Sequence, residues 1–431
     1  MTAEIAILNR SALALAADSA VTLTVGNKRK TYDTAEKLFE FSRSQPIALM
    51  IYNNVEYVGV PLDVLIRKYR SEDGGRAYST IKEAADLFLE YLRTFEHDIF
   101  EEKRYLYMVV KEVLDGINKN FGLEMRGELA EFFRGGAKGK LPSPDEVLQR
   151  LIDERTEIEK QRPLSGYLSK VTLAAFRGRF ADMLERAFQD TFKSAVVFND
   201  SLRTSVENLG FRLMKSRKES NLVTGLVFGG FAGIDMFPTL RSIEIDGVYF
   251  DQVKIISTSE IDIDRKKTRA EVVPFAQKEM VERFMYGFDV EMQESIQKFV
   301  STALDEVLTE TAKGDAALRD RVKKKVNKNF SSMLGKLKES SRQDLLDIVY
   351  FMSKKELADI AYALVELTSH KRRFSTDEQT VGGPIDVAIL TKSEGLVWIR
   401  RKHYFGPETN QGYYARNFGR GGSYESPKAA E

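Results

Sequence analysis

Three polar side chains near the start of the sequence have the types that an amide-cleaving site needs. Thr2 follows Met1 directly, Asp18 ends an apolar run, and Lys37 precedes another. A hydroxyl is a poor nucleophile near neutral pH and needs a base within hydrogen-bonding reach. Removal of Met1 would supply that base, because Thr2 would then carry a free α-amine beside its own hydroxyl. The alternative is that Thr2 is a frayed terminal residue and that Asp18 only closes a β-hairpin.

The other two side chains would tune this base. An α-amine ordinarily has a pKa of about 7.7–8.0. The ammonium group of Lys37 would disfavour the protonated amine and lower that pKa, and Asp18 would keep Lys37 charged and oriented. A lysine at a strand edge is equally well explained as a solvated strand end, so Lys37 taken alone does not decide between the two interpretations.

A β-hairpin would bring Thr2 and Asp18 together. The apolar runs AEIAIL and ALALAA flank residues 9–11, and a loop at these three residues pairs Leu8 with Ala12 and Thr2 with Asp18. Side chains alternate between the two faces of a strand, so this register predicts that Thr2 and Asp18 are neighbours on one face. A slip of one residue would separate them.

The order of these features resembles the proteasome β-subunit family and its bacterial peptidase relatives, the N-terminal nucleophile (Ntn) hydrolases. Thr2 precedes Asp18 in ALAADSA by 16 residues, Lys37 follows in AEKLFEF, and PIALMIYNN then leads into the helical VPLDVLIRKYR. The resemblance implies an α+β fold, namely a four-layer αββα sandwich of two antiparallel sheets. It also implies that Thr2 is the nucleophile and that Asp18 and Lys37 are catalytic.

The resemblance resumes downstream in two blocks. The segments SNLVTGLVFGGFAG and PTLRSIEIDGVYF predict strands with a turn at Asp246-Gly247, followed by the helix PFAQKEMVERFMYGFD. KELADIAYALVELTSHKRRF and QTVGGPIDVAILTKSEGLVWIRRK resemble the family's last helix and closing hairpin. These matches divide the chain into a first half of the core at 1–97, a helical insertion at 98–218, second-half strands and a helix at 219–290, a charged helical insertion at 291–348, a final helix and hairpin at 349–405 and a tail at 406–431.

Several supporting positions differ from the family's pattern. The Gly-rich turn whose backbone N–H binds the oxyanion corresponds to Tyr52 and Asn53, and the serine-glycine pair of the second half corresponds to Ala276-Gln277. Before the closing hairpin the family has an aspartate and a serine, which correspond to Glu378 and Val381. The resemblance therefore implies Tyr52 and Asn53 as the oxyanion and substrate-binding positions, and Glu378 as a further catalytic residue.

Composition narrows the other possibilities. The 431 residues include no cysteine and three widely spaced histidines, which excludes disulfides and cysteine catalysis and argues against a histidine metal cluster. No cofactor is expected. The formal net charge of +1 gives no reason to expect nucleic acid or a membrane surface as a partner. The lack of a long apolar run and of a secretory leader predicts a cytoplasmic protein.

The helical insertions and the tail have no counterpart in the family. Apolar residues at helical spacing in 98–218 predict either ordinary helix core or a partner-binding helix. The 291–348 segment carries LRDRVKKKVNKNF, whose lysine cluster is either a solvated helix face or a site for an anionic partner. The tail from residue 406 is poor in large aliphatic residues, which predicts a mobile segment, with weak RNA binding as the alternative.

The residues and the resemblance together predict a threonine-type peptidase or amidase that uses Thr2 after removal of Met1. One alternative is a catalytically inactive proteasome-like scaffold or interaction protein, and another is an unrelated helical binding protein. The resemblance further implies that the protein forms a homo-oligomeric ring, that its substrate is a peptide or protein, and that an ATPase or adaptor is a possible partner.

Overall fold

The computed structural model describes residues 2–25, 28–73, 75–137, 140–193, 196–311, 315–374 and 382–402, together with residues 409, 410 and 412. Within them the protein is a mixed α+β structure whose strands pair in antiparallel fashion. The α+β class and the antiparallel sheets predicted from the sequence are therefore confirmed. No helix in these ranges is both long and apolar enough to cross a lipid bilayer.

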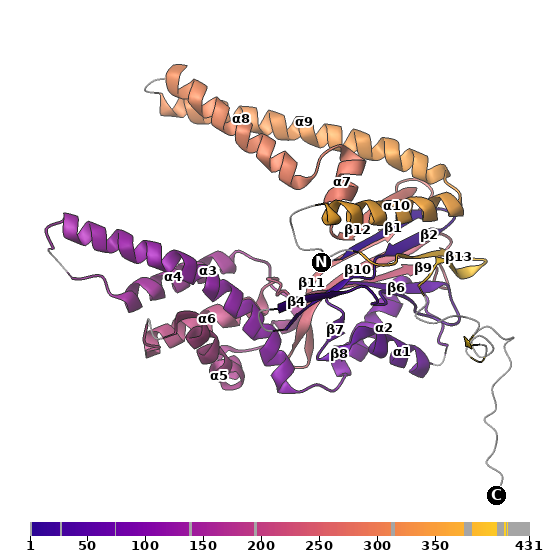
Figure 1. Cartoon of the computed structure of the whole chain (residues 1–431), viewed down its shortest axis with the longest axis horizontal. Helices are drawn as coiled ribbons and strands as arrows, with labels where there is room; N and C mark the ends of the chain where they lie inside the picture. Colours follow the sequence, from indigo (N-terminus) through magenta and orange to yellow (C-terminus); the bar gives the residue numbers. More distant parts are fainter. Residues whose placement is uncertain are drawn as a thin grey trace, which may run out of the picture.

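Two five-stranded sheets form the centre of the molecule (Figure 1). The β1 sheet has the order β12 (Ala270–Ala276), β1 (Ala3–Asn9), β2 (Leu13–Ala17), β13 (Asp386–Thr391) and β14 (Gly395–Arg400). The β6 sheet has the order β11 (Gln252–Asp262), β10 (Thr239–Tyr249), β9 (Thr224–Gly230), β6 (Ile47–Asn53) and β5 (Leu38–Glu40). Two-stranded pairs are formed by β3 (Val21–Val25) with β4 (Lys28–Tyr32), and by β7 (Glu56–Tyr57) with β8 (Val60–Pro61).

Apolar side chains of the two sheets pack against each other. Ala6 and Leu8 of β1 share one buried cluster with Met50 of β6 and with residues of β9 and β10. Because side chains alternate along a strand, Thr2 and Glu4 belong to the same face of the N-terminal strand as Ala6. The face that meets the β6 sheet therefore ends in two polar residues.

Helices cover the outer face of each sheet. Ile5 and Ile7, on the opposite face of β1, share a buried cluster with Ala361 and Val365 of α10. The helices on this side are α7 (Glu279–Tyr286), α9 (Ala316–Phe351) and α10 (Lys354–Arg373). The helices beside the β6 sheet are α1 (Leu62–Glu72), α2 (Ile81–Thr94) and the inner ends of the helices described next.

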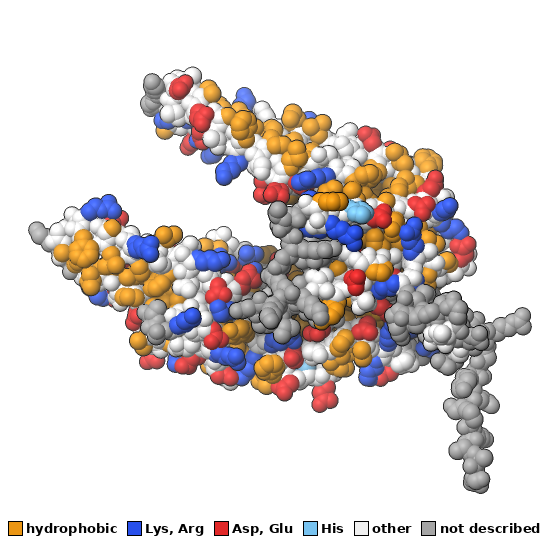
Figure 2. Space-filling view, viewed as in Figure 1, with side chains coloured by type: hydrophobic (Ala, Val, Ile, Leu, Met, Phe, Trp, Pro, Cys, Tyr) orange, Lys and Arg blue, Asp and Glu red, His pale blue; other side chains and the backbone are white. Residues whose placement is uncertain are grey.

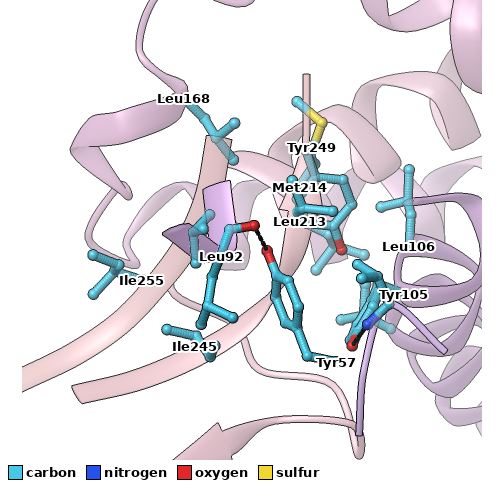
Figure 3. Packing of buried hydrophobic residues seen from close by; sticks show 14 of the residues in the cluster. Tyr57, Leu92, Tyr105, Leu106, Leu168, Leu213, Met214, Ile245, Tyr249 and Ile255 are labelled. Carbon is cyan, nitrogen blue, oxygen red and sulfur yellow. Dashed lines mark hydrogen bonds between the residues drawn. The ribbon is translucent and has the colours of Figure 1, made fainter. Parts of the chain in front are cut away.

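An aromatic-rich cluster joins the β6 sheet to the helices of residues 98–218 (Figure 3). Tyr105 of α3 and Leu213 of α6 pack with Ile245 of β10, and the Tyr57 hydroxyl donates a hydrogen bond of 3.2 Å to the carbonyl of Leu92. The inner part of this helical segment therefore shares its core with the sheet.

Two helical arms extend from the sheets to the same side, and the space-filling view shows an open hollow between them (Figures 1 and 2). One arm comprises α3 (Ile99–Arg134), α4 (Pro144–Lys160), α5 (Leu173–Phe192) and α6 (Asp200–Lys215), with the short 3₁₀ helix Gly166–Leu168. The other comprises α8 (Val290–Thr311) and α9. The lysine cluster noted in the sequence lies on α9, where Lys323 pairs with Asp305 of α8.

The first hairpin has a different register from the predicted one. Its loop has two residues, Arg10 and Ser11, because the Asn9 side chain accepts hydrogen bonds from the backbone N–H groups of Ser11 and Ala12 at 2.8 and 3.2 Å. Glu4 consequently lies opposite Ala17, one residue away from the predicted pairing. The predicted pairing of Thr2 with Asp18 across regular strands is therefore wrong.

The turn predicted at Asp246-Gly247 is also wrong, because these residues lie inside β10 at a β-bulge. Gly247 has a φ of 77°, and a Cβ there would lie 2.5 Å from the ring of Tyr105. Glycine is thus required for the close approach of α3 to the sheet. The hairpin turn itself falls at Phe250 and Asp251.

We expect Gly225→Ala to destabilise the fold, because its new Cβ would lie 2.0 Å from the ring of Tyr52. That ring is buried, packs on Phe275 and is held through its hydroxyl, so it cannot swing away. The loss should be about 1–3 kcal/mol in the free energy of unfolding by urea.

Gly335→Ala is the matched control, because it lies in α9 with nothing within 4 Å of the added methyl. That change should leave stability unchanged or raise it by about 0.5–1 kcal/mol, since alanine favours helix. Equal unfolding midpoints for Gly225→Ala and the unmodified protein would contradict the packing described for Tyr52.

Candidate active site

Asp18 and Lys37 form a buried ion pair next to Thr2. Thr2 precedes β1, Asp18 follows β2 and Lys37 precedes β5, so three strand ends supply the group. The Lys37 Nζ donates a hydrogen bond of 2.5 Å to Asp18 Oδ1. All three residues are 1% exposed or less. The solvated-end interpretation of Lys37 is therefore wrong.

Backbone geometry brings the Asp18 carboxylate to this position. In β2 the even-numbered residues Ala14 and Ala16 face α10, and strict alternation would send Asp18 the same way. The strand ends at Ala17, however, and Asp18 Oδ1 also accepts the N–H of Ala3 at 3.2 Å. An irregular position after the strand thus brings the Asp18 carboxylate to the backbone of Ala3 and to Lys37.

A distant segment completes the hydrogen bonding of Asp18. The backbone N–H of Gly382 donates to Asp18 Oδ2 at 3.0 Å. Ser19 holds this segment in place, because its N–H donates to the Gly382 carbonyl at 3.2 Å and its hydroxyl to the Pro384 carbonyl at 2.5 Å. The chain just before β13 is therefore anchored beside the ion pair.

Asn53 presents its backbone N–H to the Thr2 side chain. The N–H donates to Thr2 Oγ1 at 3.3 Å, and Asn53 has a φ of 65°. This left-handed conformation ordinarily favours glycine, and asparagine is among the few other residues that adopt it readily. Asn53 thus provides the backbone conformation of a glycine turn without a glycine.

The Tyr52 side chain has a structural role at the end of β6. Its hydroxyl donates to Glu244 Oε1 at 3.0 Å, and its ring lies over Gly225 and against Phe275. Burial, together with the carboxylate of Glu244, raises the pKa of Tyr52 far above its ordinary value. The side chain therefore stays a neutral hydroxyl that fixes the end of β6.

The second half of the chain also contacts Thr2. The backbone N–H of Gln277 donates to the Thr2 carbonyl at 3.2 Å. The Gln277 side chain accepts a hydrogen bond of 2.7 Å from Arg372 Nε of α10. Gln277 thus links Thr2 to α10, which covers the sheet. Glu378 and Val381 lie outside the described residues.

Glu4 is the residue that sequence reasoning missed. Its side chain is fully buried, and Oε1 lies 3.3 Å from Lys37 Nζ. Among the described residues, neither carboxylate oxygen has a hydrogen-bond partner of good geometry, although the Thr2 hydroxyl and the Lys37 ammonium lie close to the carboxylate. Burial raises the pKa of Glu4 to about 8, although the Lys37 ammonium acts in the opposite direction. The available signal was an acidic residue inside the apolar run AEIAIL, two positions after Thr2 and hence on its face.

One group of side chains elsewhere has the types that bind metals. Ligand atoms of His97, Glu102 and Asp251 lie within 4.8 Å of one another. Arg179 already donates to Glu102 Oε1 at 2.8 Å, and His97 Nε2 lies 3.2 Å from the same oxygen. Arg179 and His97 thus already engage Glu102 of α3. The group comprises Glu102, His97 just before that helix and Asp251 at the β10–β11 turn, and does not include Thr2.

No protein-family model matches the chain, and no curated protein matches it either. A functional interpretation therefore depends on the arrangement around Thr2. That arrangement joins a hydroxyl, a buried ammonium, two carboxylates and a backbone N–H donor in one site.

We expect Glu4→Gln to stabilise the protein increasingly as the pH rises from 5 to 9. Folded Glu4 keeps its proton up to about pH 8, whereas an unfolded glutamate ionises near its ordinary pKa of 4.5. The unmodified protein therefore loses stability across this window, and glutamine does not ionise. The gain at pH 9 relative to pH 5 should be on the order of a few kcal/mol in urea unfolding.

The control is Glu131→Gln, at an exposed position of α3. It should change the free energy of unfolding by close to zero at both pH 5 and pH 9. Parallel stability curves for Glu4→Gln and the unmodified protein would mean that Glu4 is ionised in the fold at pH 5.

Proposed function

We propose that this protein is an N-terminal threonine peptidase or amidase of the Ntn-hydrolase type, related to proteasome β subunits. The observation that carries the proposal is that the Lys37–Asp18 ion pair binds the N–H of Ala3, directly after Thr2, while the N–H of Asn53 donates to Thr2 Oγ1. The residues come from separate strands, so their meeting is not a consequence of sequence proximity. Cleavage of the Met1–Thr2 bond is required, since it creates the base.

The architecture supports the same assignment. Two antiparallel sheets pack face to face, and helices cover their outer faces. We propose that this is the four-layer αββα arrangement of the Ntn hydrolases, with residues 98–218 and 291–348 inserted as arms. The nucleophile then lies at the start of a central strand, where the two sheets meet.

Acylation is the first proposed step. The free α-amine takes the proton of the Thr2 hydroxyl as Oγ1 attacks the carbonyl carbon of an amide. The positive charge of Lys37 favours the unprotonated amine, and Asp18 holds Lys37 in place. Collapse of the tetrahedral intermediate breaks the C–N bond, and the amine passes the proton to the leaving nitrogen.

Deacylation repeats the chemistry with water. The α-amine takes a proton from a water that attacks the Thr2 ester, and returns it to Oγ1 as the acid product leaves. In both steps the oxyanion forms next to Oγ1, towards which the Asn53 N–H is directed. One such donor contributes about 3–4 kcal/mol to transition-state stabilisation in other hydrolases.

The alternative of a catalytically inactive scaffold is favoured by one observation. Thr2 is 1% exposed in the chain that still carries Met1, so its hydroxyl is closed to a substrate in that form. A protein that keeps Met1, or that stays closed, would retain the fold without the activity.

We expect Thr2→Ala to abolish hydrolysis of peptide or amide reporters, by at least about 1,000-fold, because it removes the nucleophile and leaves the amine. Thr2→Ser is the matched control, since it keeps both the hydroxyl and the amine and should retain measurable activity. Intact-mass spectrometry must first show that Met1 is absent from all three proteins.

Two outcomes would decide against the peptidase. Hydrolysis by Thr2→Ala at the rate of the unmodified protein would remove Thr2 from the site. A complete lack of hydrolysis by Met1-free protein on a broad reporter panel would favour the scaffold.

We also propose that the chain assembles with copies of itself, as the resembled family does, and that the α8–α9 arm takes part. Phe299 and Phe351 of this arm are 72% and 81% exposed. Exposed apolar surface of this kind supports a contact with another protein. Light scattering at micromolar concentration should show an oligomer that Phe299→Glu weakens. A monomer for the unmodified protein would contradict this proposal.

An ATPase or adaptor partner and a cytoplasmic location remain expectations from the sequence.

A further inference from the structure

Glu4 gives the site one carboxylate more than the proposed chemistry uses. Lys37 lies between Asp18 at 2.5 Å and Glu4 at 3.3 Å, and the three side chains are wholly shielded from solvent. Within the part of the chain that the structure describes, Asp18 has three hydrogen-bond donors, whereas both oxygens of Glu4 are without one of good geometry. Asp18 is thus the well-bonded partner of Lys37, and Glu4 is a second carboxylate that can also respond to a charge at Thr2.

The charges of the group limit which protonation states can coexist. With Asp18 negative and Lys37 positive, these two groups cancel. A free α-amine beside protonated Glu4 leaves the group neutral, and so does a protonated amine beside ionised Glu4. The two states contain the same number of protons, and buried sites disfavour the charged alternatives. Only the first state has a base ready to activate Thr2.

Of the described residues around Glu4, few others could alter this balance. Lys37 approaches Glu4 from just before β5, and Asp18 from just after β2. The Thr2 hydroxyl approaches from just before β1, and Tyr52 from β6. Tyr52 is neutral and tied to Glu244. On β12 and β2 the residues opposite Glu4 are the apolar Phe275 and Ala17.

We propose that Glu4 and the α-amine of Thr2 share a single proton, so that Glu4 restrains the nucleophile until the pH becomes alkaline. The ionised carboxylate attracts the protonated amine and keeps part of the protein without its base. Rising pH removes the shared proton from the pair and frees the amine. This inference depends on the proposed function, since it describes the regulation of the same site. Glu4 is thus a positioning residue: it acts through the proton that it shares with the α-amine and does not touch the substrate.

The test compares the pH dependence of kcat/KM for reporter hydrolysis by Met1-free Glu4→Gln and unmodified protein. Glutamine keeps the size of the side chain but cannot ionise, so the amine loses its neighbouring negative charge. The pH of half-maximal activity should fall by at least about one unit, the coupling typical of groups sharing a site. At a given pH on the acid limb, kcat/KM as a fraction of its maximum should therefore be about tenfold higher for Glu4→Gln than for the unmodified protein. The matched control is Glu102→Gln, a buried glutamate outside the site, which should not move this pH.

An unchanged or higher midpoint of the pH profile would overturn the inference. An equal loss of rate at every pH would also overturn it, because that result indicates a structural role or direct proton transfer by Glu4.

A second measurement tests this inference separately from the proposed peptidase activity. Trace acetylation of the α-amine by acetic anhydride, followed by mass spectrometry of the N-terminal peptide across pH 5–10, reports the amine's protonation without substrate. If no reporter is cleaved, the proposed function fails. The acetylation experiment still tests the shared proton in that case. A midpoint lowered by Glu4→Gln supports it, and an unmoved midpoint refutes it.

Discussion

The Lys37 ammonium lies in a site without solvent, and this burial constrains everything around it. Removing a charge of this kind from water costs several kcal/mol, which only close and well-oriented partners can offset. Asp18 at 2.5 Å and Glu4 at 3.3 Å supply opposite charge. These partners come from the ends of β2 and β1, so the ion pair depends on the two sheets being packed together. Loss of Lys37 would leave two carboxylates buried with no cation.

The packing of the sheets explains why the site lies at strand ends. Between the sheets the side chains are apolar, as with Leu8 and Met50, and cannot accommodate charge. Near the start of β1, backbone N–H groups at two strand ends and in the segment before β13 donate to the side chains of the site. Those of Ala3 and Gly382 bind Asp18, and that of Asn53 binds Thr2. Irregular backbone therefore supplies the donors that a regular sheet would have used internally.

The helical arms extend the molecule beyond this centre. The inner ends of α3 and α6 share a core with β10, whereas the α8–α9 arm buries few large side chains, with Leu308 the buried residue of α8. Stability is therefore concentrated in the sheets and the helices next to them. An arm with so little internal core is suited to contacts outside the chain, which agrees with the proposed assembly.

The sequence by itself determined the α+β class of the fold and identified the residues of the chemistry that we propose. The family resemblance predicted that Asp18 and Lys37 lie together, and they do, because each lies at the end of a strand. Hydrophobic patterning likewise predicted antiparallel strands and helices. The position of Glu378 lies outside the described residues and stays a prediction.

Only the tertiary structure decided how the three residues meet. The Asn9 side chain sets a two-residue loop that shifts the register, and Asp18 reaches Lys37 from an irregular position after β2. Asn53 adopts the left-handed conformation that a pattern search assigns to glycine. The role of Glu4 was hidden because one acidic residue in an apolar strand has no meaning until its neighbours are known. Local patterns determine which segments form strands, whereas charge and burial depend on residues brought together from distant parts of the chain.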